Sequence, residues 1–319
     1  MGRLPALLAI MLAFVNAPLA AQTPPLDPQV PPALVRTASL DDRVTIPISI
    51  DGKGPWPFVI DTGSQRTVIA RDLAQRLALP PRADVTILSM TGRSQVATVA
   101  LPRLTFGAGV IDDIEAPVLE GEHLGAAGLL GLDSLHDRRV VLNFRSGTMD
   151  IADSGRRRTF PTDPDTIVVE ARRKRGQLIL LDSRVNGMRV NIMLDTGSHY
   201  SIGNLALRDK LLRKKRAPDL LTATLTSVTG GTLIGEVGRI GSVALGRVNL
   251  TEVPVIFADA SPFAELGMQD KPALLLGISA LRVFDRVAID FARGKVDFLL
   301  PDASAITPTR LAANQPADG

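Results

Sequence analysis

The amino-acid sequence predicts an all-β protein made of two homologous lobes with short helices. The tetrapeptide Asp-Thr-Gly-Ser occurs twice, beginning at Asp61 and at Asp195, and an apolar run precedes each copy. The surrounding stretches are short and strand-like, with turn residues between them. A repeat of roughly 130 residues is too long for a solenoid unit, so it indicates a duplicated domain.

The acid of each copy stands at the end of an apolar strand. A carboxylate in such a place is costly to desolvate unless it is hydrogen-bonded or shared. Two acids in identical tetrapeptides, Asp61 and Asp195, therefore indicate two half-sites that meet. The alternative interpretation is a pair of turn-capping acids in an inactive, duplicated β domain.

Composition narrows the possible chemistry. The chain has 319 residues, which is enough for two domains. Of these residues 45% are hydrophobic and 22% charged, which is typical of globular proteins. It has no cysteine, which excludes disulfides, thiolate metal sites and cysteine nucleophiles. No two of its three histidines, His123, His136 and His199, lie at a metal-ligand spacing. We therefore expect neither a metal nor a cofactor.

The N-terminus has the pattern of a secretory signal. In residues 1–21, Arg3 is the only charge, an apolar run covers residues 4–15, and small residues precede Gln22. The run is short for a membrane span, although an uncleaved anchor is the alternative. We expect a periplasmic or secreted protein with no membrane span after signal cleavage.

The two halves use the same order of elements. In the first half, a strand-like stretch (44–50), a turn (51–54) and a second apolar strand (56–60) lead to Asp61. In the second half, the apolar stretch 178–181 and the hairpin signal Asn186-Gly187 precede the strand that leads to Asp195. Helix-like stretches and further matched motifs follow in both halves. They are residues 70–77 and 204–212, 89–92 and 227–230, 114–118 and 251–255, 128–132 and 274–278, and 141–144 and 288–291.

These matches set the predicted domain boundaries. They are a signal peptide (1–21), a Pro-rich leader (22–41), an N-terminal lobe (42–153), a basic linker (154–177), a C-terminal lobe (178–301) and a disordered tail (302–319). Whether the leader is a propeptide stays open. Three basic runs, 156–158, 172–175 and 213–216, are expected to be solvated, with anionic docking or processing as alternatives. No nucleic-acid motif accompanies them, so no nucleic-acid partner is expected.

Asp-Thr-Gly-Ser after an apolar strand, followed downstream by two apolar residues, Gly and another apolar residue, resembles the aspartic proteases. The resemblance covers nearly all of residues 42–301, and both halves carry both pieces. The only tyrosine, Tyr200, follows the second motif, so a pepsin-type flap tyrosine is absent. The chain looks like the bacterial retropepsin-like proteases, with Ser where the retroviral enzymes have Ala. This resemblance implies two lobes related by a pseudo-twofold axis.

The resemblance assigns catalysis to Asp61 and Asp195, which would hold the attacking water between them. Two carboxyls ~3 Å apart cannot easily both ionise, and the aspartic-protease dyad is itself the standard case of this effect. One carboxyl would act as base and the other as acid, and the sequence leaves open which is which. His199, beside the second motif, is expected to be a flanking residue.

The resemblance also assigns supporting roles around the dyad. Gly63 and Gly197 would approach the carboxylates with their backbone, and Ser64 and Ser198 would hydrogen-bond the outer carboxylate oxygens. The two threonines that link the half-sites would be Thr62 and Thr196. Matched hairpin tips would form two flaps over the substrate, with ordinary turns as the alternative. These flap residues are Thr91, Gly92, Thr229 and Gly230.

The sequence therefore predicts an exported aspartic endopeptidase that binds a peptide or protein substrate in extended conformation. Because both half-sites lie in one chain, we expect a monomer. One alternative is a non-catalytic peptide-binding protein of the cell envelope that keeps the protease fold. Another, a metal-dependent hydrolase that uses the same acids, lacks the histidines it would need.

Overall fold

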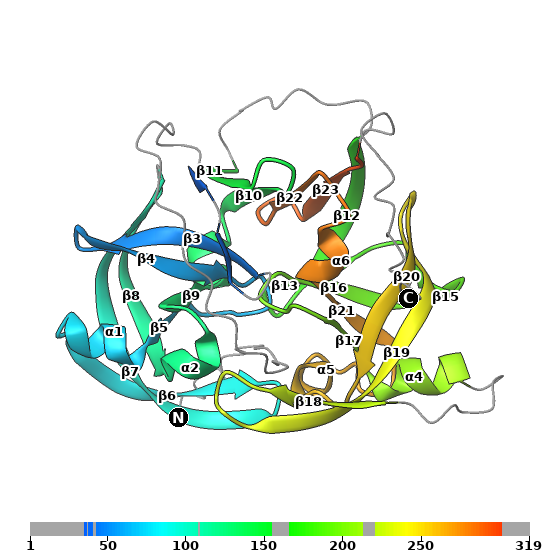
Figure 1. Cartoon of the computed structure of the whole chain (residues 1–319), viewed down its shortest axis with the longest axis horizontal. Helices are drawn as coiled ribbons and strands as arrows, with labels where there is room; N and C mark the ends of the chain where they lie inside the picture. The colour runs from blue at the N-terminus through cyan, green and yellow to red at the C-terminus, as the bar shows by residue number, and fades with distance from the viewer. Residues whose placement is uncertain are drawn as a thin grey trace, which may run out of the picture.

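The computed structural model describes residues 35–36, 38–40, 43–107, 109–154, 166–212 and 221–301. The predicted signal peptide, most of the leader, the tail 302–319 and two of the basic runs lie outside these ranges. The described part is mostly β with a few short helices, which confirms the predicted fold class (Figure 1). No helix in these ranges has the length and apolarity needed to cross a membrane.

The N-terminal lobe, on the left in Figure 1, is built on an eight-stranded sheet in the order β2-β3-β4-β9-β5-β8-β7-β6. Strand β3 also pairs with β7, which curls the sheet around its apolar face. The elements are β2 (Ala38–Leu40), β3 (Arg43–Ile50), β4 (Lys53–Ile60), β5 (Val68–Ala70), α1 (Arg71–Arg76), β6 (Pro81–Ser89), β7 (Gly92–Phe106), β8 (Gly109–Leu119), α2 (Gly121–Leu124), β9 (Gly128–Leu130) and α3 (Leu132–Leu135).

The C-terminal lobe, on the right in Figure 1, repeats this arrangement, with β16 parallel to β21 as β4 is parallel to β9. Its strands are β13 (Gln177–Leu180), β14 (Ser183–Val185), β15 (Met188–Arg189), β16 (Asn191–Asp195), β17 (Ser201–Gly203), β18 (Thr222–Thr226), β19 (Thr232–Leu245), β20 (Val248–Phe257) and β21 (Ala273–Gly277). Its helices are α4 (Leu205–Leu212), α5 (Ser261–Glu265) and α6 (Ile278–Leu281).

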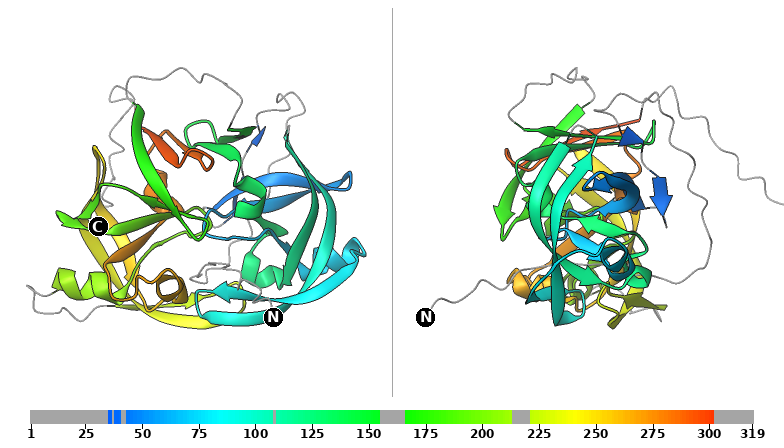
Figure 2. Two further views of the ribbon diagram at one scale, coloured as in Figure 1. Left: turned by 180° about the vertical axis from the view of Figure 1, so that it is seen from behind. Right: turned by 90° about the vertical axis from the view of Figure 1, so that its left-hand side faces the viewer.

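A set of interlobe strands joins the two lobes, at the top of Figure 1. They are ordered β1-β11-β10-β22-β23-β12, where β1 is Val35–Arg36, β10 Arg138–Asn143, β11 Thr148–Asp153, β12 Thr166–Lys174, β22 Arg286–Asp290 and β23 Lys295–Leu299. Strand β10, from the first half, pairs antiparallel with β22 from the second. The lobes are therefore connected by backbone hydrogen bonds as well as by the chain. Figure 2 shows these strands from behind and from the side.

The predicted linker 154–177 is too long, because residues Thr166–Lys174 form strand β12. Ile167, Val169 and Ala171 alternate along one face of this strand, and Val169 is buried. The run of basic residues at its end hid this alternation in the sequence. The end of the predicted leader also forms strands, since β1 pairs with β11 and β2 pairs with β3.

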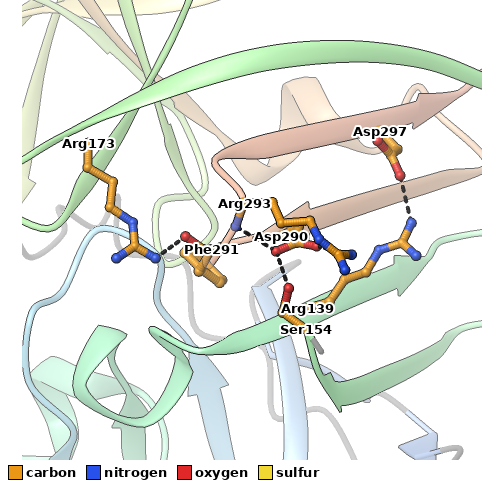
Figure 3. Close-up of polar contacts among 7 residues, drawn as sticks. All are labelled: Arg139, Ser154, Arg173, Asp290, Phe291, Arg293 and Asp297. Carbon is orange, nitrogen blue, oxygen red and sulfur yellow. Dashed lines mark hydrogen bonds and ion pairs between the residues drawn. The ribbon is translucent and has the colours of Figure 1, made fainter. Parts of the chain in front are cut away.

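The basic run 172–175 does more than face solvent. Arg173 donates a hydrogen bond to the carbonyl of His136 in the first half. It also donates to the carbonyl of Phe291 in the second half (Figure 3). Lys174 donates to the carbonyl of Leu266, and Arg175 pairs with Glu265. These side chains hold β12 against both lobes, while Arg172, Arg173 and Arg175 remain exposed to solvent as expected.

Polar groups also connect the interlobe strands (Figure 3). The buried Asp290 accepts hydrogen bonds from the Ser154 hydroxyl at 2.7 Å and from the Arg293 N–H at 2.9 Å. Arg139 of β10 pairs with Asp297 of β23 at 2.6 Å. Each of the pairs Ser154–Asp290 and Arg139–Asp297 joins one half of the chain to the other.

We predict that Ile289→Ala lowers the free energy of unfolding by about 2–5 kcal/mol, because Ile289 is fully buried at the join between the lobes. Urea denaturation would measure the change. The control is Val168→Ala on β12, whose side chain is 52% exposed and whose loss should cost about 0.5 kcal/mol or less. Equal losses in both variants would contradict the structural role of β22.

Candidate active site

Two buried strands deliver Asp61 and Asp195 to the junction of the lobes. Strand β4 ends at Ile60, and the Asp61 N–H donates to the Leu130 carbonyl of the parallel neighbour β9 at 3.0 Å. Strand β16 ends at Asp195, which lies opposite Gly277 of β21. The two side chains are 0% and 1% exposed. The apolar runs recognised in the sequence are thus the strands that place each acid.

The glycine of each tetrapeptide brings the two acids together. A Cβ atom on Gly63 would lie 2.7 Å from Asp195 Oδ1, and one on Gly197 would lie 2.4 Å from Asp61 Cγ. Each glycine backbone therefore packs against the carboxyl of the opposite lobe, where no side chain fits. The sequence predicted a close approach of backbone to carboxylate, and the structure shows that this approach crosses between the lobes.

Backbone N–H groups hold the carboxylates. Asp61 Oδ1 accepts the N–H of Gly63 at 2.8 Å and that of Ser64 at 2.9 Å. Asp195 Oδ1 accepts the N–H of Ser198 at 3.2 Å. The second oxygen of Asp61, Oδ2, is buried and accepts no hydrogen bond from a residue that the structure describes. One carboxylate oxygen is thus anchored and the other is left for a further partner.

The serine hydroxyls do not bind the carboxylates as expected from the resemblance. Ser64 Oγ donates to the Arg66 carbonyl at 2.8 Å, and Ser198 Oγ donates to the Tyr200 carbonyl at 2.7 Å. A hydroxyl has one proton to donate, and here it closes the turn after the motif. The backbone N–H of each serine binds the carboxylate instead.

The two threonines connect the half-sites reciprocally. The Thr62 hydroxyl donates to the Leu194 carbonyl at 3.0 Å, and the Thr196 hydroxyl donates to the Ile60 carbonyl at 2.7 Å. Each hydroxyl oxygen also accepts the backbone N–H of the opposite threonine, both at 3.1 Å. These four bonds cross the pseudo-twofold axis and fix the distance between the two loops.

Burial raises the pKa of both carboxyls. For Asp61, loss of water is the largest cause, and the charge of Asp195 raises its pKa further, well above the usual range. The N–H groups of Gly63 and Ser64 and the charge of Arg43 act in the opposite direction. For Asp195, burial again raises the pKa, against the N–H groups of Ser198 and Gly197. The pair therefore keeps a proton at a pH where separate aspartates would both be ionised.

The predicted flap residues lie at the tips of two hairpins, β6–β7 and β18–β19, at the bottom of Figure 1. The tips touch, because Thr229 Oγ1 donates to Ser89 Oγ at 3.1 Å and a Cβ on Gly231 would lie 2.4 Å from Thr91 Oγ1. Gly92 and Gly230 both have positive φ, at 128° and 82°. The structure thus pairs the two tips that the sequence matched.

Each tip also contacts the opposite lobe. The Met90 carbonyl accepts the Ser261 N–H of α5 at 3.0 Å, and Met90 packs into an apolar cluster with Phe263 and Leu266. The other tip meets the first lobe, since a Cβ on Gly230 would lie 2.7 Å from His123 Cε1. Each hairpin tip therefore contacts the lobe to which it does not belong.

Sequence reasoning missed two buried polar residues at the dyad, Arg43 and Gln177. Gln177 Nε2 donates to the Gly63 carbonyl at 2.6 Å, and Arg43 Nη2 donates to the Leu124 carbonyl at 2.8 Å. The sequence contains a signal for this pair, because each residue lies 18 positions before the aspartate of its own half (61 − 43 and 195 − 177). His199, predicted to flank the site, packs edge-on against the Tyr200 ring with 4.3 Å between centroids.

Within the described ranges, no three His, Cys, Asp or Glu side chains gather into a group that could hold a metal ion. The chemistry that the residues on view support is that of a buried, proton-sharing carboxyl pair. The pair lies where two lobes meet, between loops held by their own backbone and by each other's threonines.

Comparisons with known proteins gave a family match and similar solved structures. A family model described as aspartyl protease matches residues 46–134 and 181–280, which together exceed half of the chain. No curated protein matches. Among solved structures, the chain is similar to a retropepsin-like aspartic protease from Rickettsia conorii, at 22% identity over 42% of this chain and 92% of that one, with a TM-score of 0.28. On the two matched regions, the chain belongs to the aspartyl protease family.

Proposed function

We propose that the protein is an exported aspartic endopeptidase of the retropepsin-like kind, which hydrolyses peptide bonds with a water activated by Asp61 and Asp195. The observation that carries this proposal is the meeting of the two buried carboxyls, each packed against the glycine of the other lobe. Membership of the aspartyl protease family supports it. Export rests on the N-terminal signal pattern, and a monomer on the presence of both half-sites in one chain.

In the proposed mechanism the pair holds one proton. The ionised carboxyl takes a proton from the bound water while the water oxygen attacks the scissile carbonyl carbon. The protonated carboxyl gives its proton to the carbonyl oxygen, which yields a tetrahedral diol. Proton transfer to the peptide nitrogen then lets the C–N bond break, which leaves a carboxylic acid and an amine. The raised pKa of both groups keeps the necessary proton on the pair.

The substrate would lie extended between the dyad and the two hairpin tips, where strand-like pairing can hold its backbone. The tips are joined by the bond between Thr229 and Ser89, so entry of a long chain requires this contact to open. A lid of this kind would exclude water from the reacting groups once it closes.

We predict that Asp61→Asn and Asp195→Asn each reduce cleavage of an unstructured protein substrate at least about 100-fold, because an amide can neither accept nor share the proton. Product formation would be followed by mass spectrometry. The control is Asp290→Asn, a buried aspartate of the interlobe strands, which should keep activity if it folds. Full activity in either dyad variant would remove that aspartate from the chemistry. Substrate binding without cleavage by the unmodified chain would favour a peptide-binding protein instead.

Activity should fall as the pH rises past the upper apparent pKa of the pair, because the last shared proton is then lost. The raised pKa of both carboxyls places this decline at a higher pH than separate aspartates would give. A pH series of kcat/KM with the fold monitored by circular dichroism would measure it. A flat profile from acid into alkaline buffer would contradict a shared proton.

The same pKa shift predicts that Asp61→Asn stabilises the fold at neutral pH. Below about pH 4 the carboxyl is protonated in both the folded and the unfolded chain, so its ionisation adds no difference. Above that pH the unfolded chain ionises first, so the penalty on folding grows until the folded pKa is reached and stays constant above it. We expect a gain of about 1 kcal/mol or more at pH 7.5 that vanishes near pH 3.

Urea denaturation at the two pH values would measure this gain. Asp290→Asn serves as the control and should gain no stability at either pH, because Asp290 accepts hydrogen bonds from Ser154 and Arg293 that the amide only partly replaces. A loss of stability in Asp61→Asn at pH 7.5 would show that the carboxylate is not penalised by burial.

A further inference from the structure

The two half-sites differ in the residue that faces each aspartate across the neighbouring strand. In the β3–β4 ladder, Thr45 pairs with Val59 and Ile46 with Phe58, and continuing this register by two residues places Arg43 opposite Asp61. In the β13–β16 ladder, Ile179 pairs with Met193, and the same step of two places Gln177 opposite Asp195. Residues directly opposite on antiparallel strands share a face and interact.

The two facing residues are equally buried and chemically different. Arg43 is 1% exposed and Gln177 is 0% exposed. Gln177 is neutral and reaches the opposite lobe, where its amide donates to the Gly63 carbonyl. Arg43 keeps its positive charge at every accessible pH, since a guanidinium does not lose its proton in proteins. The pseudo-twofold symmetry of the site is therefore broken by one full charge.

Hydrogen bonding favours the same side. The Asp61 carboxylate accepts the N–H groups of Gly63 and Ser64 at 2.8 and 2.9 Å. The N–H of Ser198 reaches Asp195 at the longer distance of 3.2 Å, and the N–H of Gly197 also acts on Asp195. Shorter bonds to a carboxylate oxygen stabilise its ionised form more. The donors and the nearby guanidinium thus act together on Asp61.

The other titratable groups near the pair do not repeat this effect. Asp195 is the like-charged partner, whose ionised form opposes ionisation of Asp61. Asp133 of α3 lies behind the first loop and is bound to Thr67. His199 flanks the second loop and packs on Tyr200. Arg66, two positions after Ser64, pairs with Glu115.

We propose that Arg43 is a positioning residue that makes the dyad asymmetric, favouring the singly ionised pair over the neutral one and drawing its negative charge toward Asp61. In the proposed reaction this bias favours Asp61 as the base and Asp195 as the acid. This inference rests on the proposed function for its catalytic meaning. The charge asymmetry itself can be measured without a substrate.

The first test is the pH profile of kcat/KM for the full chain and for Arg43→Gln, which makes the first half-site resemble the second. Loss of the positive charge should move both limbs of the profile to higher pH, by about one unit. Arg43→Lys keeps the charge and should keep the limbs in place. The control is Arg139→Gln, a partly buried arginine paired with Asp297, which should leave the limbs unmoved.

The second test uses no substrate. The stability difference between a protein and its Asp61→Asn counterpart is measured by urea denaturation across the pH range, and it levels off at the pH where Asp61 is ionised in the fold. Without the charge of Arg43 this pH should rise by about one unit, and with Arg43→Lys it should not. Arg43→Met replaces Arg43→Gln if the latter fails to fold.

The outcomes separate the two proposals. A shift in the stability experiment without protease activity would support the role of Arg43 and overturn the proposed catalysis. If the pH at which the stability difference levels off is unchanged in the folded charge-removing variant, the role of Arg43 is overturned, whatever the activity. A lower kcat/KM with unmoved limbs would assign Arg43 to structure alone. A shift in Arg43→Lys equal to that in Arg43→Gln would show that charge is not the cause.

Discussion

The structure depends on a contact between two loops that are 134 positions apart in the sequence. Each loop presents a buried carboxyl, which would be unfavourable if it were alone. The reciprocal bonds of Thr62 and Thr196 hold the loops together, and Gly63 and Gly197 leave no space between backbone and carboxyl. The apolar strands set the depth of the acids, and the interlobe strands hold the lobes at one distance.

Burying a pair of like charges has a free-energy cost for folding, which other contacts in the molecule must offset. Backbone N–H groups offset part of it, and a retained proton removes the repulsion between the two carboxylates by keeping one of them neutral. The interlobe pairing of β10 with β22 and the bonds of Arg173 and Asp290 stabilise the junction where this cost arises. Stability and reactivity therefore depend on the same interface, because the contacts between the lobes also keep the two carboxyls close enough to share a proton.

The sequence predicted the features that are encoded locally and written twice. The strands that lead to Asp61 and Asp195 and the matched hairpin tips follow from short motifs, and the cross-linking threonines follow from the family resemblance that these motifs carry. Strand β12 was missed because basic residues obscure its alternation. The serine hydroxyls were assigned to the wrong partners because a tetrapeptide does not reveal which donor a carboxylate will take. Arg43 was missed because strand register places it opposite Asp61, and the residue at the matching offset in the second half, Gln177, has a different chemistry.

Because both half-sites lie in one chain, a residue beside one aspartate can change without the same change beside the other. In a symmetric dimer every substitution appears twice, so a positive charge beside one aspartate would also stand beside the other. In this chain the halves have diverged, with Arg43 against Gln177 and Asp133 against Ser279 at matched positions. The threonines and glycines that join the loops are the same in both halves, and the charged residues behind them differ. The geometry of the contact has stayed symmetric while its electrostatics have not, and a reaction that needs one acid and one base can use that difference.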